Sequence, residues 1–262
     1  MLRQSYMVYK TDKIAKEARL CYEQAAVQGK PTPTPTATPA SAINLTVEPV
    51  DTEAPSLTPT PKDVSQEFLE LRRAFKNDDI VGYLQIPGTS IGYPVTQSSD
   101  NAYYLRNDIN KQKSPAGWVF MDYRNNVGND DPNTVIYGHN MQRDIIFHSL
   151  RYYQDWDYFN KNRYIIFNTI YENDIWEVFS FYKTDISFIY NQVVFPTEQS
   201  FFTLETEMKS RSLYDTGVDI KPGDHILTLS TCTDESEDTR FVLNARRLSP
   251  DEIPEDMKEL VN

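Results

Sequence analysis

Short segments in which apolar and polar residues alternate dominate the chain from about residue 80 onward. Eight such segments can be delimited, at 81–87, 91–97, 117–124, 134–140, 163–170, 174–182, 226–232 and 240–247. A period of two is typical of β-strands, and turn-forming residues separate the segments, as at Pro87-Gly88 and Asp131-Pro132. Eight short strands within about 170 residues predict a mainly β fold, an eight-stranded closed β-barrel.

Within residues 63–262, three other stretches have the helical period. The first has apolar residues spaced as one face of an amphipathic helix, at Val64, Phe68, Leu71 and Phe75. It predicts an N-terminal helix that leads into the barrel. The other two predict helical inserts between strands, over 144–154 and 197–214.

The first part of the chain differs in composition. Residues 1–28 have mixed charge and a helical pattern, and residues 30–62 are rich in Pro and Thr. A Pro/Thr-rich segment cannot bury a core and behaves as an extended spacer. We therefore predict a disordered polar tail and stalk over 1–62 and a single β-barrel domain over 63–262.

Composition excludes some classes of function. The 262 residues carry a net charge of −12, which argues against a nucleic-acid partner, because phosphate contacts need clustered Lys and Arg. The two cysteines, Cys21 and Cys232, do not resemble a disulfide framework. No run approaches the roughly 20 apolar residues that span a bilayer, and residues 1–25 lack the apolar core of a signal peptide.

Cys232 is the first candidate for chemistry. If segments 226–232 and 240–247 pair across the acidic loop 233–239, the Cys232 thiol and the Arg240 guanidinium come within side-chain reach. A cation at that distance favours the thiolate, which is the nucleophilic form of cysteine.

The residues around Cys232 help to decide whether it is a buried structural residue or a reactive one. A cysteine at the end of an apolar strand is often a small buried hydrophobic residue with no chemical role. Here its neighbours are polar, namely Ser230, Thr231, Thr233 and Asp234. They predict a strand end that is open to solvent.

The chain has three histidines that could act with Cys232. His139 follows Gly138 at the end of a strand, as Cys232 does, whereas His148 lies in a predicted helix and His225 in a turn. His139 is therefore the preferred partner, although it could also be a structural, hydrogen-bonded residue. A metal site formed by His139, His148 and Cys232 is the weaker alternative, since the spacing matches no ligand motif and a fourth ligand is not evident. We predict no metal.

A cysteine with a histidine base earlier in the chain is suited to thiol acyl transfer. The thiolate attacks a carbonyl carbon, and the imidazolium protonates the leaving amine. Arg240 would place a fixed positive charge near the developing oxyanion. In papain-like enzymes the cysteine precedes the histidine, so that arrangement does not apply.

These residues carry a resemblance to a known family. YGHN at 137–140, LSTC at 229–232 and Arg240 resemble the sortases, a family of cysteine transpeptidases, and the similarity extends over about residues 64–250. The leading helix, the segment 81–95, NAYYL at 101–105 and the long insert before the last strands resemble class B sortases in particular.

The resemblance implies a role for each residue. It implies an eight-stranded barrel in which Cys232 is the nucleophile, His139 the general acid and base, and Arg240 the oxyanion or substrate-positioning group. It implies no cofactor. The residues at positions where class B enzymes line the substrate groove are Asn101, Leu105, Tyr137 and Ser230. The loop near residues 183–200 is expected to contribute to specificity.

The family also implies a function. The enzyme would cleave a C-terminal sorting signal of surface proteins after Thr and hold the acyl group as a thioester on Cys232. It would then transfer that group to an amine of a peptidoglycan precursor or a pilin, with hydrolysis as a side reaction. Such enzymes are membrane-anchored outside the cell in Gram-positive bacteria, and an anchor is not visible in this sequence. The alternative is a non-catalytic β-barrel module that binds cell-wall peptides, with Cys232 structural.

Overall fold

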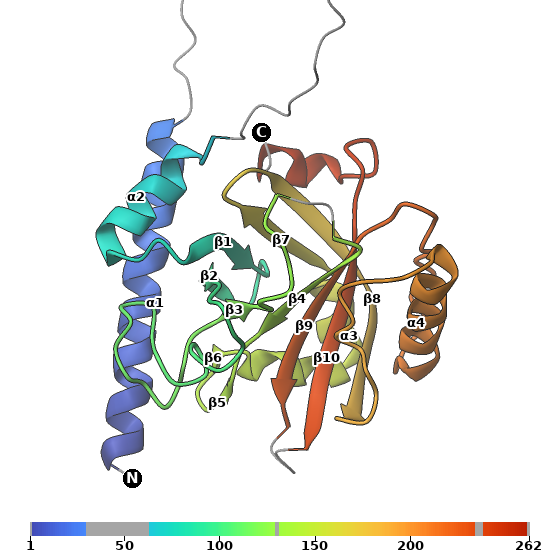
Figure 1. The fold of residues 1–262 in the computed structure, drawn as a ribbon, viewed down its shortest axis with the longest axis horizontal. Helices are drawn as coiled ribbons and strands as arrows, with labels where there is room; N and C mark the ends of the chain where they lie inside the picture. Colours follow the sequence, from blue (N-terminus) through green and yellow to red (C-terminus); the bar gives the residue numbers. More distant parts are fainter. Residues whose placement is uncertain (1, 30–62, 129–130, 234–237, 261–262) are drawn as a thin grey trace, which may run out of the picture.

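The computed structural model of the chain describes residues 2–29, 63–128, 131–233 and 238–260. At its centre is a closed barrel of eight strands in the order β1-β2-β3-β4-β9-β10-β8-β7 (Figure 1). The barrel strands are β1 Ile80–Gln85, β2 Gly92–Thr96, β3 Phe120–Met121, β4 Asn133–Tyr137, β7 Tyr164–Thr169, β8 Asn173–Asp185, β9 Ile226–Cys232 and β10 Thr239–Arg247. The predicted eight-stranded barrel is confirmed.

Most neighbouring strands in the barrel are antiparallel, but two pairs are parallel. These are β2 with β3, and β4 with β9. The two final strands form an antiparallel pair in which Leu243 lies opposite Leu229. A parallel pair brings the same ends of two strands together, and this property decides where the functional side chains meet.

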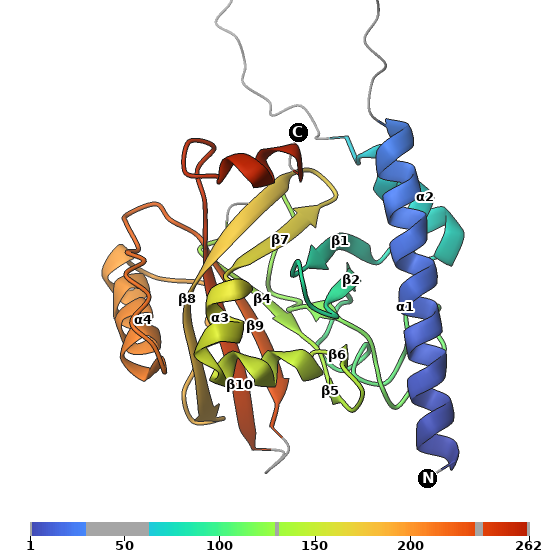
Figure 2. The ribbon, with the colours of Figure 1, turned by 180° about the vertical axis from the view of Figure 1, so that it is seen from behind.

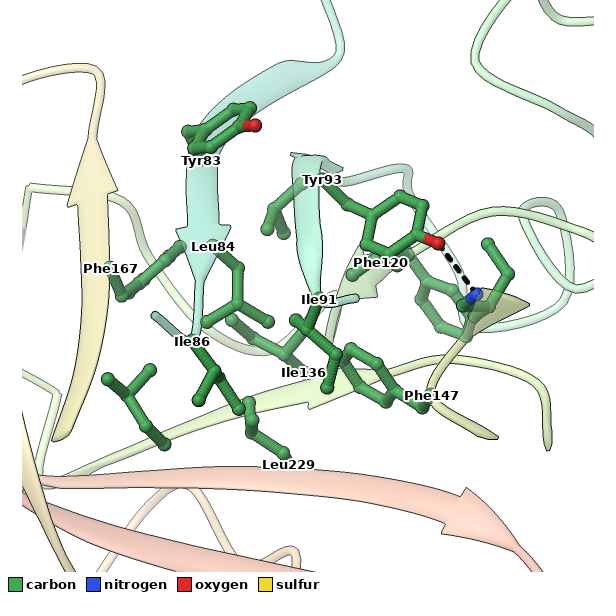
Figure 3. Packing of buried hydrophobic residues seen from close by; sticks show 14 of the residues in the cluster. Tyr83, Leu84, Ile86, Ile91, Tyr93, Phe120, Ile136, Phe147, Phe167 and Leu229 are labelled. Carbon is green, nitrogen blue, oxygen red and sulfur yellow. Dashed lines mark hydrogen bonds between the residues drawn. The ribbon is translucent and has the colours of Figure 1, made fainter. Parts of the chain in front are cut away.

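The barrel is closed around an apolar interior. Leu84 of β1, Ile136 of β4 and Leu229 of β9 are all fully buried in one cluster and point toward one another in Figure 3. The alternate residues Phe241, Leu243 and Ala245 of β10 belong to the same cluster. The apolar face predicted for this strand therefore faces the barrel interior.

Helices surround the barrel. Besides α1 (Leu2–Gly29), they are α2 Gln66–Phe75, the 3-10 helix η1 His148–Gln154, α3 Trp156–Lys161, α4 Glu198–Arg211 and the 3-10 helix η2 Glu255–Leu260. Figure 1 shows α1 and α4 on opposite sides of the barrel. Helix α2 buries Phe68 and Leu71, and α4 begins with a capping box formed by Thr197 and Ser200. The predicted leading helix and the predicted second insert are confirmed.

The first predicted insert has a different structure. Instead of one helix over 144–154, the chain forms a small hairpin, β5 (Asn140–Met141) and β6 (Ile145–Ile146), before η1 begins. Arg143, Asp144 and Ile146 have positive φ angles of 64°, 56° and 59°. A right-handed helix cannot contain such residues, so the helical spacing of the apolar residues here was misleading.

The outer face of the last two strands is covered. Val242 and Ile226 pack with Met208 of α4 in a second apolar cluster. Beside this cluster lies a buried polar chain, in which Asn244 Nδ2 donates to Thr228 Oγ1 (2.9 Å) and Ser180 Oγ donates to Asn244 Oδ1 (2.9 Å).

The burial of residues at the end of β9 corrects one prediction. The polar neighbours Ser230, Thr231 and Thr233 are 1%, 3% and 7% exposed, so they do not form an open strand end. The hydroxyls of Ser230 and Thr233 are hydrogen-bonded to those of Tyr190 and Thr239, whereas the buried Thr231 hydroxyl has no hydrogen-bond partner among the described residues. The fourth polar neighbour, Asp234, lies outside the described residues.

Helix α1 also departs from the prediction. Residues 2–29 are not a disordered tail but one helix packed along the domain, as both Figure 1 and Figure 2 show. The Tyr22 ring stacks on Tyr83, with centroids 4.1 Å apart, and its hydroxyl accepts a hydrogen bond from Asn168 Nδ2 (2.9 Å). Lys10 Nζ forms an ion pair with Asp108 (3.1 Å). The predicted stalk over 30–62 lies outside the described residues, and the boundary at residue 63 stays a prediction.

Tyr22 provides a test of this packing. We expect Tyr22→Ala to lower the free energy of unfolding by about 2–4 kcal/mol, because a buried aromatic ring and its stacking partner are lost. The matched control is Tyr9→Ala on the same helix, where the side chain is 64% exposed and the change should stay within about 0.5 kcal/mol. Urea unfolding of both variants measures the difference. Equal stabilities would contradict the docking of α1 on the barrel.

Candidate active site

The parallel pairing of β4 with β9 brings two strand ends together. Tyr137 of β4 is in register with Ser230 of β9, and Gly138 N donates to Ser230 O (3.2 Å). His139 follows Tyr137 by two positions, and Cys232 follows Ser230 by two positions. The backbones of His139 and Cys232 therefore leave the sheet at the same end of adjacent strands.

The antiparallel pairing of β9 with β10 adds the third residue. The two alternating segments do pair, and Arg240 is the register partner of Cys232. The structure describes the backbone of Cys232, at the last position of β9, and its side chain lies outside the described part. The Arg240 guanidinium is half-buried, and its Nη1 donates to Thr239 O (3.0 Å).

The His139 ring is held by the loop that precedes β3. Its Nε2 lies 2.9 Å from the carbonyl oxygen of Leu105. Because a carbonyl oxygen only accepts, this contact places a proton on Nε2, so that in the neutral ring Nδ1 is the basic nitrogen. Gly117 makes this approach possible, since a Cβ there would lie 2.9 Å from Leu105 O and 3.0 Å from His139 Cδ2.

The hairpin after His139 supports its backbone from the other side. Phe147 N donates to His139 O (3.1 Å). The Tyr93 hydroxyl accepts from Ile146 N (2.9 Å), and a dashed line marks this bond at the Tyr93 hydroxyl in Figure 3. Ile146 is a β-branched residue at positive φ, a conformation that persists only where the surroundings impose it. A Cβ on Gly138 would lie 2.8 Å from both Ile146 and Phe147, so only glycine fits between strand and hairpin.

A groove of about 340 Å³ opens beside these residues. His139, Arg240 and Thr231 lie among its lining residues. The remaining wall is mostly apolar and aromatic, formed by Asn101, Leu105, Phe120, Tyr137, Gly138, Ile186, Phe188, Ile189, Tyr190, Asn191 and Ser230. Ile186 and Ile189 are 58% and 66% exposed, which is unusual for large apolar side chains and typical of a binding surface.

The structure brings the four predicted groove residues together in this lining. Leu105 and Tyr137 lie near His139. Asn101 lies in the same loop as Leu105, between β2 and β3. The Ser230 hydroxyl is engaged inside the protein, 2.8 Å from the hydroxyl of Tyr190. Ser230 therefore fastens the segment after β8 to β9 as well as lining the groove.

Sequence reasoning identified the loop near 183–200 but not its individual residues. The wall consists of residues 186–191, ISFIYN, an apolar run between a strand and a helix that contributes Ile186 and Ile189 to the surface. An exposed apolar run in a loop was a signal that could have been used.

A buried carboxylate lies under the groove and was not predicted at all. Asp122 Oδ2 accepts from Tyr137 OH (2.9 Å) and Asn101 Nδ2 (2.9 Å), and Arg124 Nη2 is 2.7 Å away. Burial by itself raises the pKa of Asp122, but the hydrogen bonds from Arg124, Asn101 and Tyr137 outweigh it and lower the pKa. Burial and the negative charge of Asp122 raise the pKa of Tyr137, so that the phenol stays protonated.

Neither of the other two histidines lines this groove. His148 Nδ1 is 2.6 Å from Asn140 Oδ1, and His225 Nδ1 donates to Asp131 O (3.1 Å). Within the described ranges, no group of three or more His, Cys, Asp or Glu side chains is placed to hold a metal ion. No helix of the described chain is both long and apolar enough to cross a membrane.

A larger hollow of about 720 Å³ lies at the other end of β10. The Arg246 guanidinium in this hollow is already paired, because it makes two hydrogen bonds to the Glu252 carboxylate, of 2.9 and 3.1 Å. These bonds hold the pKa of Glu252 at about 2. The smaller groove, which His139 and Arg240 line together with apolar residues, is therefore the candidate active site.

Comparison with known proteins identifies the family of the chain. The model of the sortase domain family matches residues 84–248. Sortase B of Listeria monocytogenes is 37% identical over 175 residues, which are 67% of this chain and 70% of the relative. Sortase B of Staphylococcus aureus is 35% identical over 172 residues, 65% of this chain and 70% of the relative.

Solved structures agree as well. Sortase B from Bacillus anthracis in complex with AAEK2 superposes with a TM-score of 0.73 at 29% identity, covering 92% of this chain and 97% of that one. A Staphylococcus aureus sortase B-substrate complex gives a TM-score of 0.67 at 34% identity, covering 71% and 87%. The chain belongs to the sortase family, and within it to class B.

Proposed function

We propose that this protein is a cysteine transpeptidase that attaches surface proteins to the cell envelope, with Cys232 as nucleophile, His139 as general acid and base, and Arg240 as the oxyanion or positioning group. The observation that supports this most directly is the strand register. It places Tyr137 beside Ser230 and Arg240 opposite Cys232, so that three chemically suited residues converge from two adjacent strand pairs.

In the first half of the proposed reaction the Cys232 thiolate attacks the carbonyl carbon of the Thr residue at which the sorting signal is cleaved. The positive charge of Arg240 favours the thiolate before attack and the oxyanion after it. Protonated His139 then gives its Nδ1 proton to the leaving amine, the C–N bond breaks, and a thioester remains on Cys232.

In the second half an amine attacks the thioester. Neutral His139 takes the proton from the incoming amine, and the sulfur leaves as thiolate, which restores the starting pair. Water in place of the amine gives hydrolysis as a side reaction. The contact between His139 Nε2 and Leu105 O, 2.9 Å, supports this cycle because it keeps the same nitrogen available in both halves.

The apolar groove supports a peptide substrate. Phe188 and Ile189 would contact apolar side chains of the sorting signal, while Asn101 would bind its backbone. The acceptor would be an amine of a peptidoglycan precursor or a pilin. The Gram-positive origin of the Listeria and Staphylococcus relatives supports a place in the cell envelope. A non-catalytic module that binds cell-wall peptides is the competing proposal.

The test is direct transfer. The full chain is incubated with a library of sorting-signal peptides that contain Thr at the cleavage position, with and without candidate amines, and the products are identified by mass spectrometry. We expect a Thr-terminated acyl product joined to the amine, and the free acid when no amine is added. Peptide binding without any cleavage across the library would favour the non-catalytic module.

A further inference from the structure

A buried carboxylate beneath the groove takes no part in the proposed chemistry. Asp122 directly follows β3 and is 0% exposed. It accepts three hydrogen bonds from Arg124, of 2.7, 2.8 and 3.0 Å, and one each from Asn101 and Tyr137, both 2.9 Å. Burial of an ionised carboxylate is costly unless it is paired in this way, and two of the partners are groove residues.

Asp122 is linked to three different walls of the groove, to two of them directly and to the third through Arg124. Asn101 lies in the loop before β3, and Tyr137 ends β4. The third wall, residues 186–191, is reached through Arg124, whose Nη2 also donates to Asn191 O (2.8 Å). Asn191 Nδ2 in turn donates to the Tyr137 hydroxyl (2.9 Å). One carboxylate thus connects all three walls.

The charge of Asp122 also decides which way its partners point. An ionised carboxylate only accepts hydrogen bonds, so Asn101 must turn its amide nitrogen toward Asp122. The amide oxygen of Asn101 accepts from Tyr123 N (3.0 Å). The amide is therefore held at both ends, and its second N–H makes no hydrogen bond to any residue that the structure describes. Asn101 lines the groove, and an amide N–H is the kind of group from which a peptide carbonyl accepts.

We propose that Asp122 is a positioning residue for the peptide: its carboxylate orients the Asn101 amide and the Tyr137 hydroxyl and fastens the 186–191 wall through Arg124. The inference rests on the proposed function, in which a peptide occupies this groove. Asp122→Asn keeps the shape of the side chain but replaces an accepting oxygen by a donating NH₂. One of the three partners then faces a donor, and the amide of Asn101 is no longer fixed.

The experiment compares steady-state kinetics of the full-length parent and Asp122→Asn on the Thr-containing peptide that the parent cleaves fastest. We expect KM to rise about tenfold, and kcat to stay within about threefold because the reacting residues are not touched. The matched control is Asp131→Asn. Asp131 also accepts from an amide side chain and a backbone N–H, those of Asn125 (2.9 Å) and Asn126 (2.7 Å), but it lies outside the groove. Its KM should equal that of the parent.

A double variant separates a positioning role of Asp122 from a general structural effect, because it shows whether the changes in KM at two residues are coupled. If Asp122 acts through Asn101, the double variant Asp122→Asn/Asn101→Ala should have about the KM of the more impaired single variant. An unchanged KM for Asp122→Asn, a loss confined to kcat, or fully additive effects would overturn the inference. Should circular dichroism show that Asp122→Asn does not fold, Arg124→Gln tests the same connection from a side chain that is 37% exposed, and an unchanged KM there would be equally decisive.

A second readout keeps this inference distinct from the proposed function. The rate at which a thiol reagent alkylates Cys232 should be the same in parent and Asp122→Asn, because the variant alters the peptide groove and not the thiol. If the parent cleaves no peptide, the proposed function fails. The inference is then decided by fluorescence anisotropy with the labelled library peptides, where Asp122→Asn should weaken binding about tenfold. Equal binding, or no binding by the parent, overturns it.

Discussion

Replacing Cys232 by alanine is expected to abolish peptide cleavage and thioester formation, with a loss in turnover on the order of 10⁶-fold, because nucleophile and base act as a unit. The fold should be unchanged, since the substitution removes one sulfur atom at the last residue of β9. Cleavage in the library assay and the mass of the trapped thioester measure the effect. Retained cleavage by Cys232→Ala would rule out the nucleophile.

The chain contains its own control for this experiment. Cys21 is half-buried on α1, and burial, followed by the nearby charge of Glu70, raises the pKa of its thiol. It should therefore react slowly with a sulfonate-type thiol reagent, and Cys21→Ala should leave turnover unchanged. Rapid loss of activity on alkylation in the Cys21→Ala background would assign the reactive thiol to Cys232. A Cys232 that resists the reagent would favour the non-catalytic module.

Arg240→Lys is expected to lose most of the activity and Arg240→Ala nearly all of it. Arginine presents a planar fork of donors, whereas lysine is a compact point charge, so a role in holding an oxyanion should not survive the exchange. Removing one oxyanion donor typically costs about 2.7–4 kcal/mol, a factor of about 10² to 10³ in turnover. Both variants should melt at the temperature of the parent.

The competing role for Arg240 is to order the acidic loop 233–239 through an ion pair. A pair of that kind near the surface is worth about 0–1 kcal/mol, and lysine would replace arginine in it almost without loss. Steady-state kinetics of Arg240→Lys, at matched circular dichroism, decide between the two roles. Turnover within about threefold of the parent, about 0.65 kcal/mol, would refute the catalytic role.

Much of the barrel could be read from local pattern. Alternation along β9 and β10 predicted both strands, and their pairing, considered as a condition, brings Arg240 near Cys232; the register that sets the two residues opposite each other comes from the structure. Where local pattern failed, contacts with distant residues had decided the structure. Ile146, Leu150 and Tyr153 have helical spacing, yet Tyr93, far earlier in the chain, accepts the hydrogen bond from Ile146 N that holds the turn before η1.

Helix α1 is a second element whose structure could not be predicted from its local sequence pattern. Its mixed charge led to the prediction of a polar tail, because a helix of low hydropathy has no visible partner in its own sequence. The partner is the surface formed by α2 and β2. Ala18 is fully buried, and the Arg19 guanidinium lies against Gly92, where a Cβ would clash with it. Complementarity between two surfaces cannot be read from either one alone.

The barrel strands, the leading helix and the residue types at the site follow from local pattern, because period and residue chemistry are properties of neighbours along the chain. Which strand ends meet depends instead on long-range pairing. The parallel pairing of Tyr137 with Ser230 brings His139 and Cys232 to one edge, and the contacts of Asp122 join three distant segments beneath it. These contacts depend on how the whole barrel closes, since a buried charge is stable only where the folded chain delivers all its partners at once.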